Sequence, residues 1–190
     1  MKFLLTAGIV LVCLGLGEVI FAWFGIYNIA ATEPHWGITS SFIGILRDRS
    51  IAVRSEDIRA LNMDDAKLKE AGVPHFHETC RLCHEAPGYR RAEFAEGLYP
   101  LPPSMTSGSI QKSLGDAEIY WIVKHGLKMT GMPAFGPTHD EAELWGVVAI
   151  VEEIPRISPE QYRQLVKSTN TGGEKSHGHS HGTTEGEKGS

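Results

Sequence analysis

Two cysteines and a histidine stand close together in Cys80-Arg81-Leu82-Cys83-His84. Positions i, i+3 and i+4 of a helix share one face, so a helix here would present two thiols and one imidazole to the same flat object. Each thiol can add to one vinyl group of a haem, while the adjacent histidine ligates its iron from one side. The spacing therefore predicts one covalent haem c, attached through Cys80 and Cys83, with His84 as an axial iron ligand.

Two other kinds of site would use the same two thiols in place of a haem. A zinc ion held by Cys80, Cys83 and two of the histidines His75, His77 and His84 would normally need a second close ligand pair. A redox-active dithiol of the thioredoxin kind would have strands around it, and no strand pattern occurs in the sequence. The context favours haem over both, and a haem ligated by two histidines stays open as a variant. The third cysteine, Cys13, lies apart in an apolar N-terminal stretch.

A thioether sulfur opposite the histidine is a common arrangement for electron-transfer haem. Met132 is the first candidate, because Pro133 and the glycines of Gly131-Met132-Pro133-Ala134-Phe135-Gly136 fix an irregular loop between two predicted helices. Met129 is the second candidate for this axial position and Met105 a distant third. The alternative for Met132 is a core residue that fills a gap, which is a common role of methionine.

Apolar periodicity and capping residues predict an all-α domain with one long loop. A first helical stretch is expected from about Asp65 to His84, divided at Pro74 so that a lead-in ends near Gly72. The long loop is rich in glycine and proline and spans residues 85–113. Further helices are expected at Asp116–His125 with Gly126 as the stop, from a capping box of Thr138 and Glu141 to just before Pro155, and briefly from Ser158-Pro159.

The N-terminal residues predict a membrane anchor. The run from Phe3 to Tyr27 is apolar except for Glu18 and is long enough to cross a bilayer as a helix. We expect this helix to be uncleaved, and the alternative is a signal peptide cut at Gly15-Leu16-Gly17. Glu18 would then meet a partner helix or lie near the interface. The expected organisation is an anchor at 1–31, a connector at 32–63, the domain at 64–168 and a disordered tail at 169–190.

Composition limits the classes of partner. The chain has 190 residues and a formal net charge of −5, from 18 Lys+Arg and 23 Asp+Glu. It has no dense basic patch, so we expect no nucleic-acid partner. The tail carries His177, His179 and His181, which could bind copper, nickel or zinc loosely, although a solvated tail is the simpler interpretation.

Residues 65–156 resemble class I c-type cytochromes and are similar to the small haem domains of the cbb3-oxidase subunit III type. The resemblance rests on the Cys80–His84 motif, on Gly72 and Phe76 before it, and on Met132-Pro133. It implies a small cytochrome c fold of about four helices around one covalent haem. It also implies that Gly72 and Phe76 pack on the last helix near Trp145 and Val148, and that the carbonyl of Pro102 or Pro103 accepts the Nδ1 proton of His84. Ile150 departs from the aromatic residue expected in such a last helix.

The resemblance implies electron transfer by a haem domain on the periplasmic side of the cytoplasmic membrane, with redox proteins as partners. Two alternatives are a haem c subunit of a larger membrane oxidoreductase and a haem-based gas sensor or peroxidase-like enzyme, which would need a weak sixth ligand. Arg81, Lys124 and Lys128 are candidates for a docking rim that attracts an acidic partner. Because Met132 would close the sixth position, we expect an electron carrier and not an enzyme.

Overall fold

The computed structural model describes residues 1–172, in two compact units that divide between Ser41 and Phe42. Within these residues every regular element is helical, and the sole extended pairing is an isolated bridge between Ala86 and Tyr89. The prediction of an all-α fold is confirmed. The histidines predicted for the tail lie outside the described residues.

The first unit contains α1, Lys2–Trp23, which is 22 residues long and has a mean hydropathy of 2.3 in its most apolar window. Within residues 1–172 it is the one helix long and apolar enough to cross a membrane, as predicted. Aromatic rings gather around its C-terminal end: the ring of Trp36 lies 5.0 Å from that of Tyr27 and 5.9 Å from that of Phe21, which belongs to α1. Such amphipathic aromatic residues are typical of a membrane–water interface.

Helix α2, Gly37–Ser55, occupies most of the predicted connector. Its C-terminal part belongs to the second unit, where Ile51 is buried and the hydroxyl of Ser55 donates to the carbonyl of Ile51 at 3.0 Å. Toward its N-terminal end Phe42, Ile45 and Leu46 are exposed. Most of the connector is therefore a helix, and its fully buried residues, Ile51 and Ser55, lie near its C-terminal end.

A nearly continuous helix carries the Cys–His motif in the second unit. It consists of α3 (Ala66–His75), a π-helical turn (Phe76–Cys80) and α4 (Arg81–His84). The predicted division at Pro74 is wrong, because α3 continues through this proline. A proline inside a helix costs about 3 kcal/mol, but burying a side chain the size of Val73 or Phe76 recovers about 1.5–3 kcal/mol each. The π-helical turn follows α3 directly and ends at Cys80, so that Cys83 and His84 lie in the last turn of the continuous helix.

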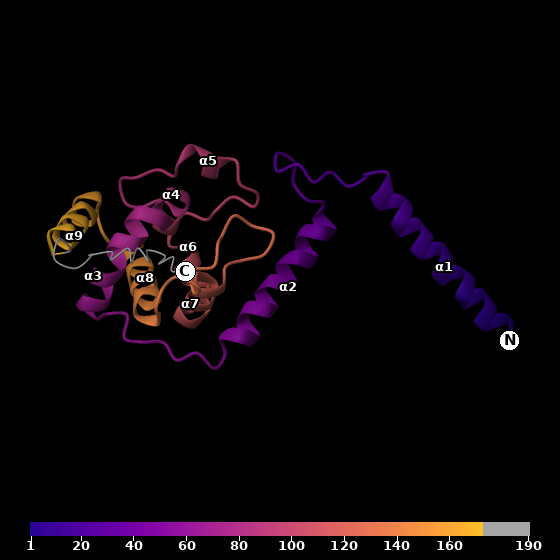
Figure 1. Cartoon of the computed structure of the whole chain (residues 1–190), viewed down its shortest axis with the longest axis horizontal. Helices are drawn as coiled ribbons and strands as arrows, with labels where there is room; N and C mark the ends of the chain where they lie inside the picture. The colour runs from indigo at the N-terminus through magenta and orange to yellow at the C-terminus, as the bar shows by residue number, and fades with distance from the viewer. Residues whose placement is uncertain (173–190) are drawn as a thin grey trace, which may run out of the picture. The chain divides into compact units, whose positions relative to one another are not determined.

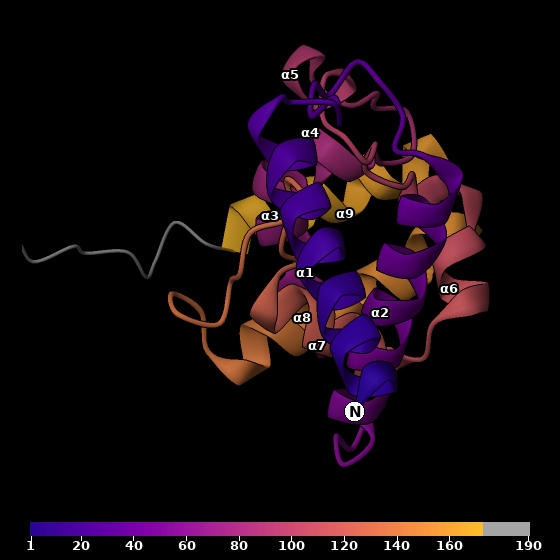
Figure 2. The ribbon, with the colours of Figure 1, turned by 90° about the vertical axis from the view of Figure 1, so that its right-hand side faces the viewer.

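The remaining helices complete a core around α3 and α8. They are α5 (Glu93–Glu96), α6 (Ser109–Ser113), α7 (Asp116–His125), α8 (Glu141–Glu153) and α9 (Pro159–Gly172), with short 3₁₀ turns at Met105–Ser107 and Ile154–Arg156. Helices α3 and α8 lie side by side, and α7 also packs on α8 (Figure 1). The loop that bears α5 covers the end of the unit away from α7 (Figure 2).

The helix ends follow local hydrogen bonding. Helix α7 has the predicted bounds, and Gly126 after it adopts a φ of 65°. The capping box predicted for Thr138 and Glu141 is wrong: Asp140 caps α8, accepting from the Glu143 N–H at 2.9 Å, and Glu143 accepts from the Asp140 N–H at 3.0 Å. Thr138 instead donates to the carbonyl of Phe135. Helix α9 is longer than the short helix expected, with 14 residues.

The crossing of α3 over α8 depends on two glycines. A Cβ atom at Gly72 would lie 1.9 Å from the carbonyl oxygen of Gly146, and a Cβ at Gly146 would lie 2.8 Å from the nitrogen of Gly72. Neither helix can approach this closely with a side chain at either position. The expected packing of Gly72 against the last helix, next to Trp145, is confirmed. Phe76 and Ile150 are both buried in the same core.

Candidate haem-binding site

The two thiols stand at the end of the π-helical turn and on α4. Cys80 and Cys83 are each half-buried and unbonded, one helical turn apart. Burial raises the pKa of Cys80 to about 12 and also raises the pKa of Cys83. Both sulfurs are therefore held as neutral thiols, beside each other and on the same side of the helix as His84.

The ring of His84 is oriented by the long loop. Its Nδ1 donates to the carbonyl of Pro103 at 2.9 Å, so the Nε2 atom is the unprotonated ring nitrogen. Burial lowers the pKa of His84, although the Pro103 bond opposes the shift, so the ring is neutral. Within residues 1–172 Nε2 has no hydrogen-bond partner, which leaves it available to a metal. Pro102, the other candidate carbonyl, accepts from Arg91 instead.

The loop of Met132 folds back on the end of α7. The backbone N–H groups of Phe135 and Gly136 donate to the carbonyls of Val123 and Lys124 at 3.1 and 2.9 Å. A Cβ at Gly126 would lie 2.7 Å from the carbonyl carbon of Pro133, so only glycine permits this return. Met132 itself is half-buried and packs against the core, with its N–H bonded to the hydroxyl of Thr130 at 3.1 Å.

The other candidate methionines have different surroundings. Met129 is 75% exposed and has a positive φ of 60°, on the outside of the same loop. Met105 is buried in the hydrophobic core, in the 3₁₀ turn after the proline-rich segment. Of the three, Met132 is the one that is neither in open solvent nor filling the core.

The family model for cytochrome c oxidase, cbb3-type, subunit III matches residues 67–150. Residues 67–150 are a c-type cytochrome domain. The match begins in α3 and ends in α8, so it includes the Cys–His motif, the proline-rich loop and the Met132 loop. No curated protein matches the chain. The donor set fits a haem, because two thiols and an imidazole with a free Nε2 share one helix face.

The other histidines of the cytochrome domain face partners of their own. His77 Nδ1 and the hydroxyl of Tyr162 are 3.1 Å apart, and His75 Nδ1 lies 3.1 Å from Nε2 of His139. Burial lowers the pKa of His75 and of His77. Among residues 1–172 there is no group of three or more histidine, cysteine or acidic side chains placed to hold a metal ion. The arrangement of these side chains therefore does not support the zinc alternative.

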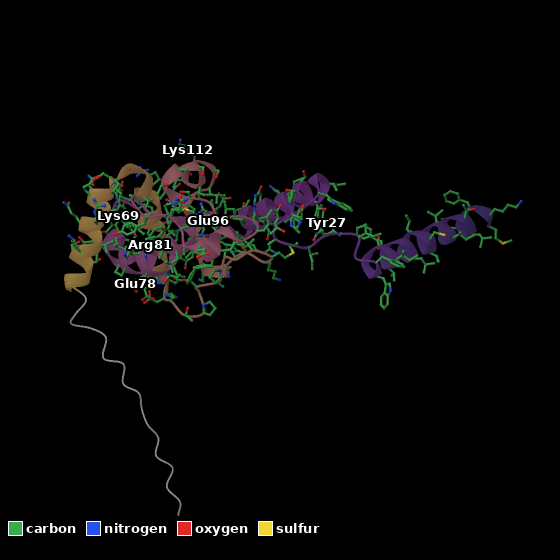
Figure 3. The ribbon with its side chains drawn as sticks, turned by 90° about the horizontal axis from the view of Figure 1, so that it is seen from above. Tyr27, Lys69, Glu78, Arg81, Glu96 and Lys112 are labelled. Atoms are coloured by element: carbon green, nitrogen blue, oxygen red, sulfur yellow. The ribbon has the colours of Figure 1, made fainter. Side chains whose placement is uncertain are left out.

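Two of the three residues expected in a docking rim are tied within the cytochrome domain. Arg81, labelled in Figure 3, donates from Nε to the carbonyl of His77 at 2.9 Å and stacks on Tyr89. Lys124 is paired with Glu141 at 3.0 Å. Lys128 is exposed at the start of the Met132 loop. A rim of three freely projecting cations does not form.

Several residues that position the site were missed from the sequence. Arg91 is buried beside the motif, Gly146 completes the helix crossing, and Tyr162 on α9 is fully buried against His77. Gly146 carried a signal, because a glycine inside an apolar helix usually has a packing reason. Arg91 and Tyr162 carried none, since an arginine in a loop and a tyrosine in a polar helix are ordinary surface residues.

Proposed function

We propose that the chain is a membrane-anchored monohaem c-type cytochrome that carries single electrons, with His84 and Met132 as axial ligands. The observation that carries the proposal is the bond from His84 Nδ1 to the Pro103 carbonyl. It leaves Nε2 as the free nitrogen on the face that also bears Cys80 and Cys83. Fixing one nitrogen of a histidine through a carbonyl orients the ring and increases the basicity of the other.

Met132 is proposed for the opposite side because its loop is held to α7 by backbone hydrogen bonds and its side chain is half-buried. A bound haem would supply one-electron chemistry at its iron. If His84 and Met132 both held the iron of such a haem, no open position would be left for a substrate, which favours electron transfer over catalysis. Solvent-exposed Met129 is the second candidate for this ligand.

The proposed location is the cytoplasmic membrane, with α1 retained as a single span and the cytochrome domain on the periplasmic side. The length and hydropathy of α1 support the anchor. Covalent haem attachment in this family takes place outside the cytoplasm, which supports the side. The proposed organisation is an anchor at 1–31, a connector at 32–63, a cytochrome domain at 64–168 and a tail at 169–190, and α9 continues into the first residues of that tail as far as Gly172.

A second candidate is a haem c subunit of a larger membrane oxidoreductase, favoured by the similarity to a subunit of cbb3-type oxidase. The chemistry of the chain would be the same, and the permanence of its partner would differ. Glu18, the acidic residue of α1, would then contact a partner helix. Extraction in a mild detergent separates the two: a stoichiometric partner that co-purifies supports the subunit, and a chain purified alone supports the independent carrier.

The proposal is tested by absorption spectra of the purified full chain, oxidised and then reduced with dithionite. We expect a sharp c-type α-band on reduction and a weak far-red band from sulfur–iron bonding in the oxidised protein. The far-red band should vanish in Met132→Ala and persist in the matched variant Met129→Ala. Its loss in Met129→Ala would move the ligand to that residue. A haem spectrum without the band in the wild type, together with ready carbon monoxide binding, would indicate a sensor instead.

A further inference from the structure

Arg91 is a buried cation next to the motif, with a role that the proposed ligands leave unexplained. Its side chain is 9% exposed, and its shortest contact is from Nη1 to the carbonyl of Pro102 at 2.7 Å. Its acidic neighbours are farther away than this carbonyl: Nε lies 3.4 Å from the carboxylate of Glu85 and 3.7 Å from that of Glu96 on α5. Glu96 is labelled in Figure 3. Burying a guanidinium is unfavourable unless its hydrogen bonds are satisfied, so this placement calls for a reason.

The segment that Arg91 contacts cannot hold itself in place. Pro100, Pro102 and Pro103 have no N–H group, so Leu101 is the only amide donor in four residues. A segment of this composition is fixed through its carbonyl groups, by donors that come from elsewhere. Arg91 supplies the donor to the Pro102 carbonyl, and His84 Nδ1 supplies the donor to the next carbonyl, that of Pro103.

Arg91 is itself anchored to the motif helix. The N–H of Ala92, the next residue, donates to the carbonyl of Leu82 on α4 at 2.7 Å. Glu85, which directly follows His84, faces the same guanidinium. The guanidinium thus joins the end of α4 to the proline segment across a planar fork, a geometry that the point charge of a lysine cannot reproduce.

We propose that Arg91 is a positioning residue that holds the Pro102–Pro103 segment against His84 and thereby sets the donor strength of the axial imidazole. This inference rests on the proposed function. A firm Nδ1–H···O=C bond makes Nε2 a stronger electron donor and favours the oxidised iron. Loosening the proline segment weakens that bond and raises the reduction potential.

The test compares Arg91→Lys with Arg90→Lys in the full chain. Both variants keep the net charge. Arg90 is an exposed neighbour whose side chain forms no hydrogen bond or ion pair within residues 1–172. In the reduced protein, NMR follows solvent exchange of the His84 Nδ1 proton, and a redox titration gives the midpoint potential. In Arg91→Lys we expect the His84 Nδ1 proton to exchange about tenfold faster than in wild type, because one charge-assisted hydrogen bond to the proline segment is lost. The midpoint potential of this variant should also be higher than that of wild type. Arg90→Lys should match wild type in both.

Unchanged exchange and potential in Arg91→Lys, or equal changes in Arg90→Lys, would overturn the inference. If Arg91→Lys does not yield folded haem protein, the wild type still decides: the guanidinium protons of Arg91 should exchange more slowly than those of Arg90, and equal rates would count against the role. A wild type without haem would overturn the proposed function and this inference together. If the wild type bears haem but the exchange of the His84 Nδ1 proton does not change in Arg91→Lys, the inference alone would be overturned.

Discussion

Glu85 adopts a backbone conformation that normally requires glycine. Its φ is 64° and its ψ 166°, in a region where a Cβ atom is strained. The residue directly follows His84 and turns the chain out of α4 into the long loop. A hydrogen bond with Ser104, and then the charge of Arg91, lower the pKa of its carboxyl group. The side chain is therefore held as a carboxylate at the turn, and its contacts offset part of the backbone strain.

Replacing Glu85 separates the strain from the side-chain contacts. Glu85→Gly and Glu85→Ala both remove the carboxylate, but only glycine relieves the backbone. We expect Glu85→Gly to be more stable than Glu85→Ala by about 1–3 kcal/mol in urea unfolding, the reverse of the usual order of the two residues. Equal stabilities would mean that the turn relaxes without strain when the carboxylate is absent.

His75 makes stability depend on pH. Its Nε2 is buried without a hydrogen-bond partner among the described residues, and its Nδ1 faces His139. Burial is the largest cause that lowers its pKa below 6.5, followed by His139, while Glu143 and Glu78 act in the opposite sense. The folded protein therefore favours the neutral ring more than the unfolded chain does. This stabilisation is fully present above pH 6.5, the ordinary pKa of the histidine in the unfolded chain. It is lost as the pH falls from there through the lower pKa that His75 has in the folded protein.

Urea unfolding of wild type and His75→Gln between about pH 7 and pH 5 checks this dependence. As the pH is lowered, the free energy of unfolding should decrease in both proteins. It should decrease less steeply in His75→Gln, because the unfolded chain of this variant takes up one proton fewer. Part of the slope should remain, because burial also lowers the pKa of His77. A slope identical to that of wild type would show that protonation of His75 does not oppose folding.

At the scale of elements, the α3–α8 crossing supports the whole site. It places the N-terminal half of the motif-bearing helix on the core, through Gly72 and Gly146. An added methyl group at Gly72 would overlap the backbone of α8, where no side-chain rotation can make room. The helices would have to separate, which would expose apolar groups along their contact, such as Val73 and Val148.

We expect Gly72→Ala to destabilise the domain by about 3 kcal/mol or more, in the range of severe packing defects, and to lower the yield of haem-bearing protein. The control is Gly44→Ala in α2, where a Cβ meets nothing within 4 Å. There alanine should be neutral or stabilising by up to about 1 kcal/mol, from its better helix propensity. Urea unfolding and the haem-to-protein absorbance ratio check both variants. Comparable losses in the two would contradict the crossing.

The sequence predicted most where one local signal was decisive and least where distant packing competed with it. Helix α7 could be bounded correctly because Gly126 stops it without help from other elements. Pro74 was misjudged because the burial of its neighbours outweighs a local penalty. The cap of α8 moved because two adjacent capping boxes are both plausible by type, and the one at Asp140 forms. The thiols, His84 and Met132 could be proposed from spacing, but the Arg91 contact depends on a fold of the proline segment that spacing does not encode.

At the scale of the whole molecule, charge decides which partners approach fastest. Residues 64–156 carry 14 acidic and nine basic side chains, which gives a formal charge of −5. Arg81 and Lys124, two of the cations expected to form an attractive rim, are engaged within the domain. Lys128 is left as the exposed cation of that group near the Met132 loop. The net acidic field should therefore dominate over a local basic rim.

Electron exchange with small redox reagents of opposite charge distinguishes the two fields. We expect the field to appear in how salt changes the rate at which the reduced full chain, in a neutral detergent, reacts with a cationic cobalt(III) complex and with ferricyanide, each reagent being compared with itself at low and high ionic strength. Added salt should slow the cationic reaction, by about tenfold if steering is at the lower end of its usual range, and should speed the anionic one, because screening removes attraction and repulsion alike. The opposite pattern would mean that Lys128 and its surroundings control approach, and Lys128→Gln should then abolish it. Rates independent of salt for both reagents would exclude electrostatic steering by either field, and so would contradict a charged docking surface on this domain.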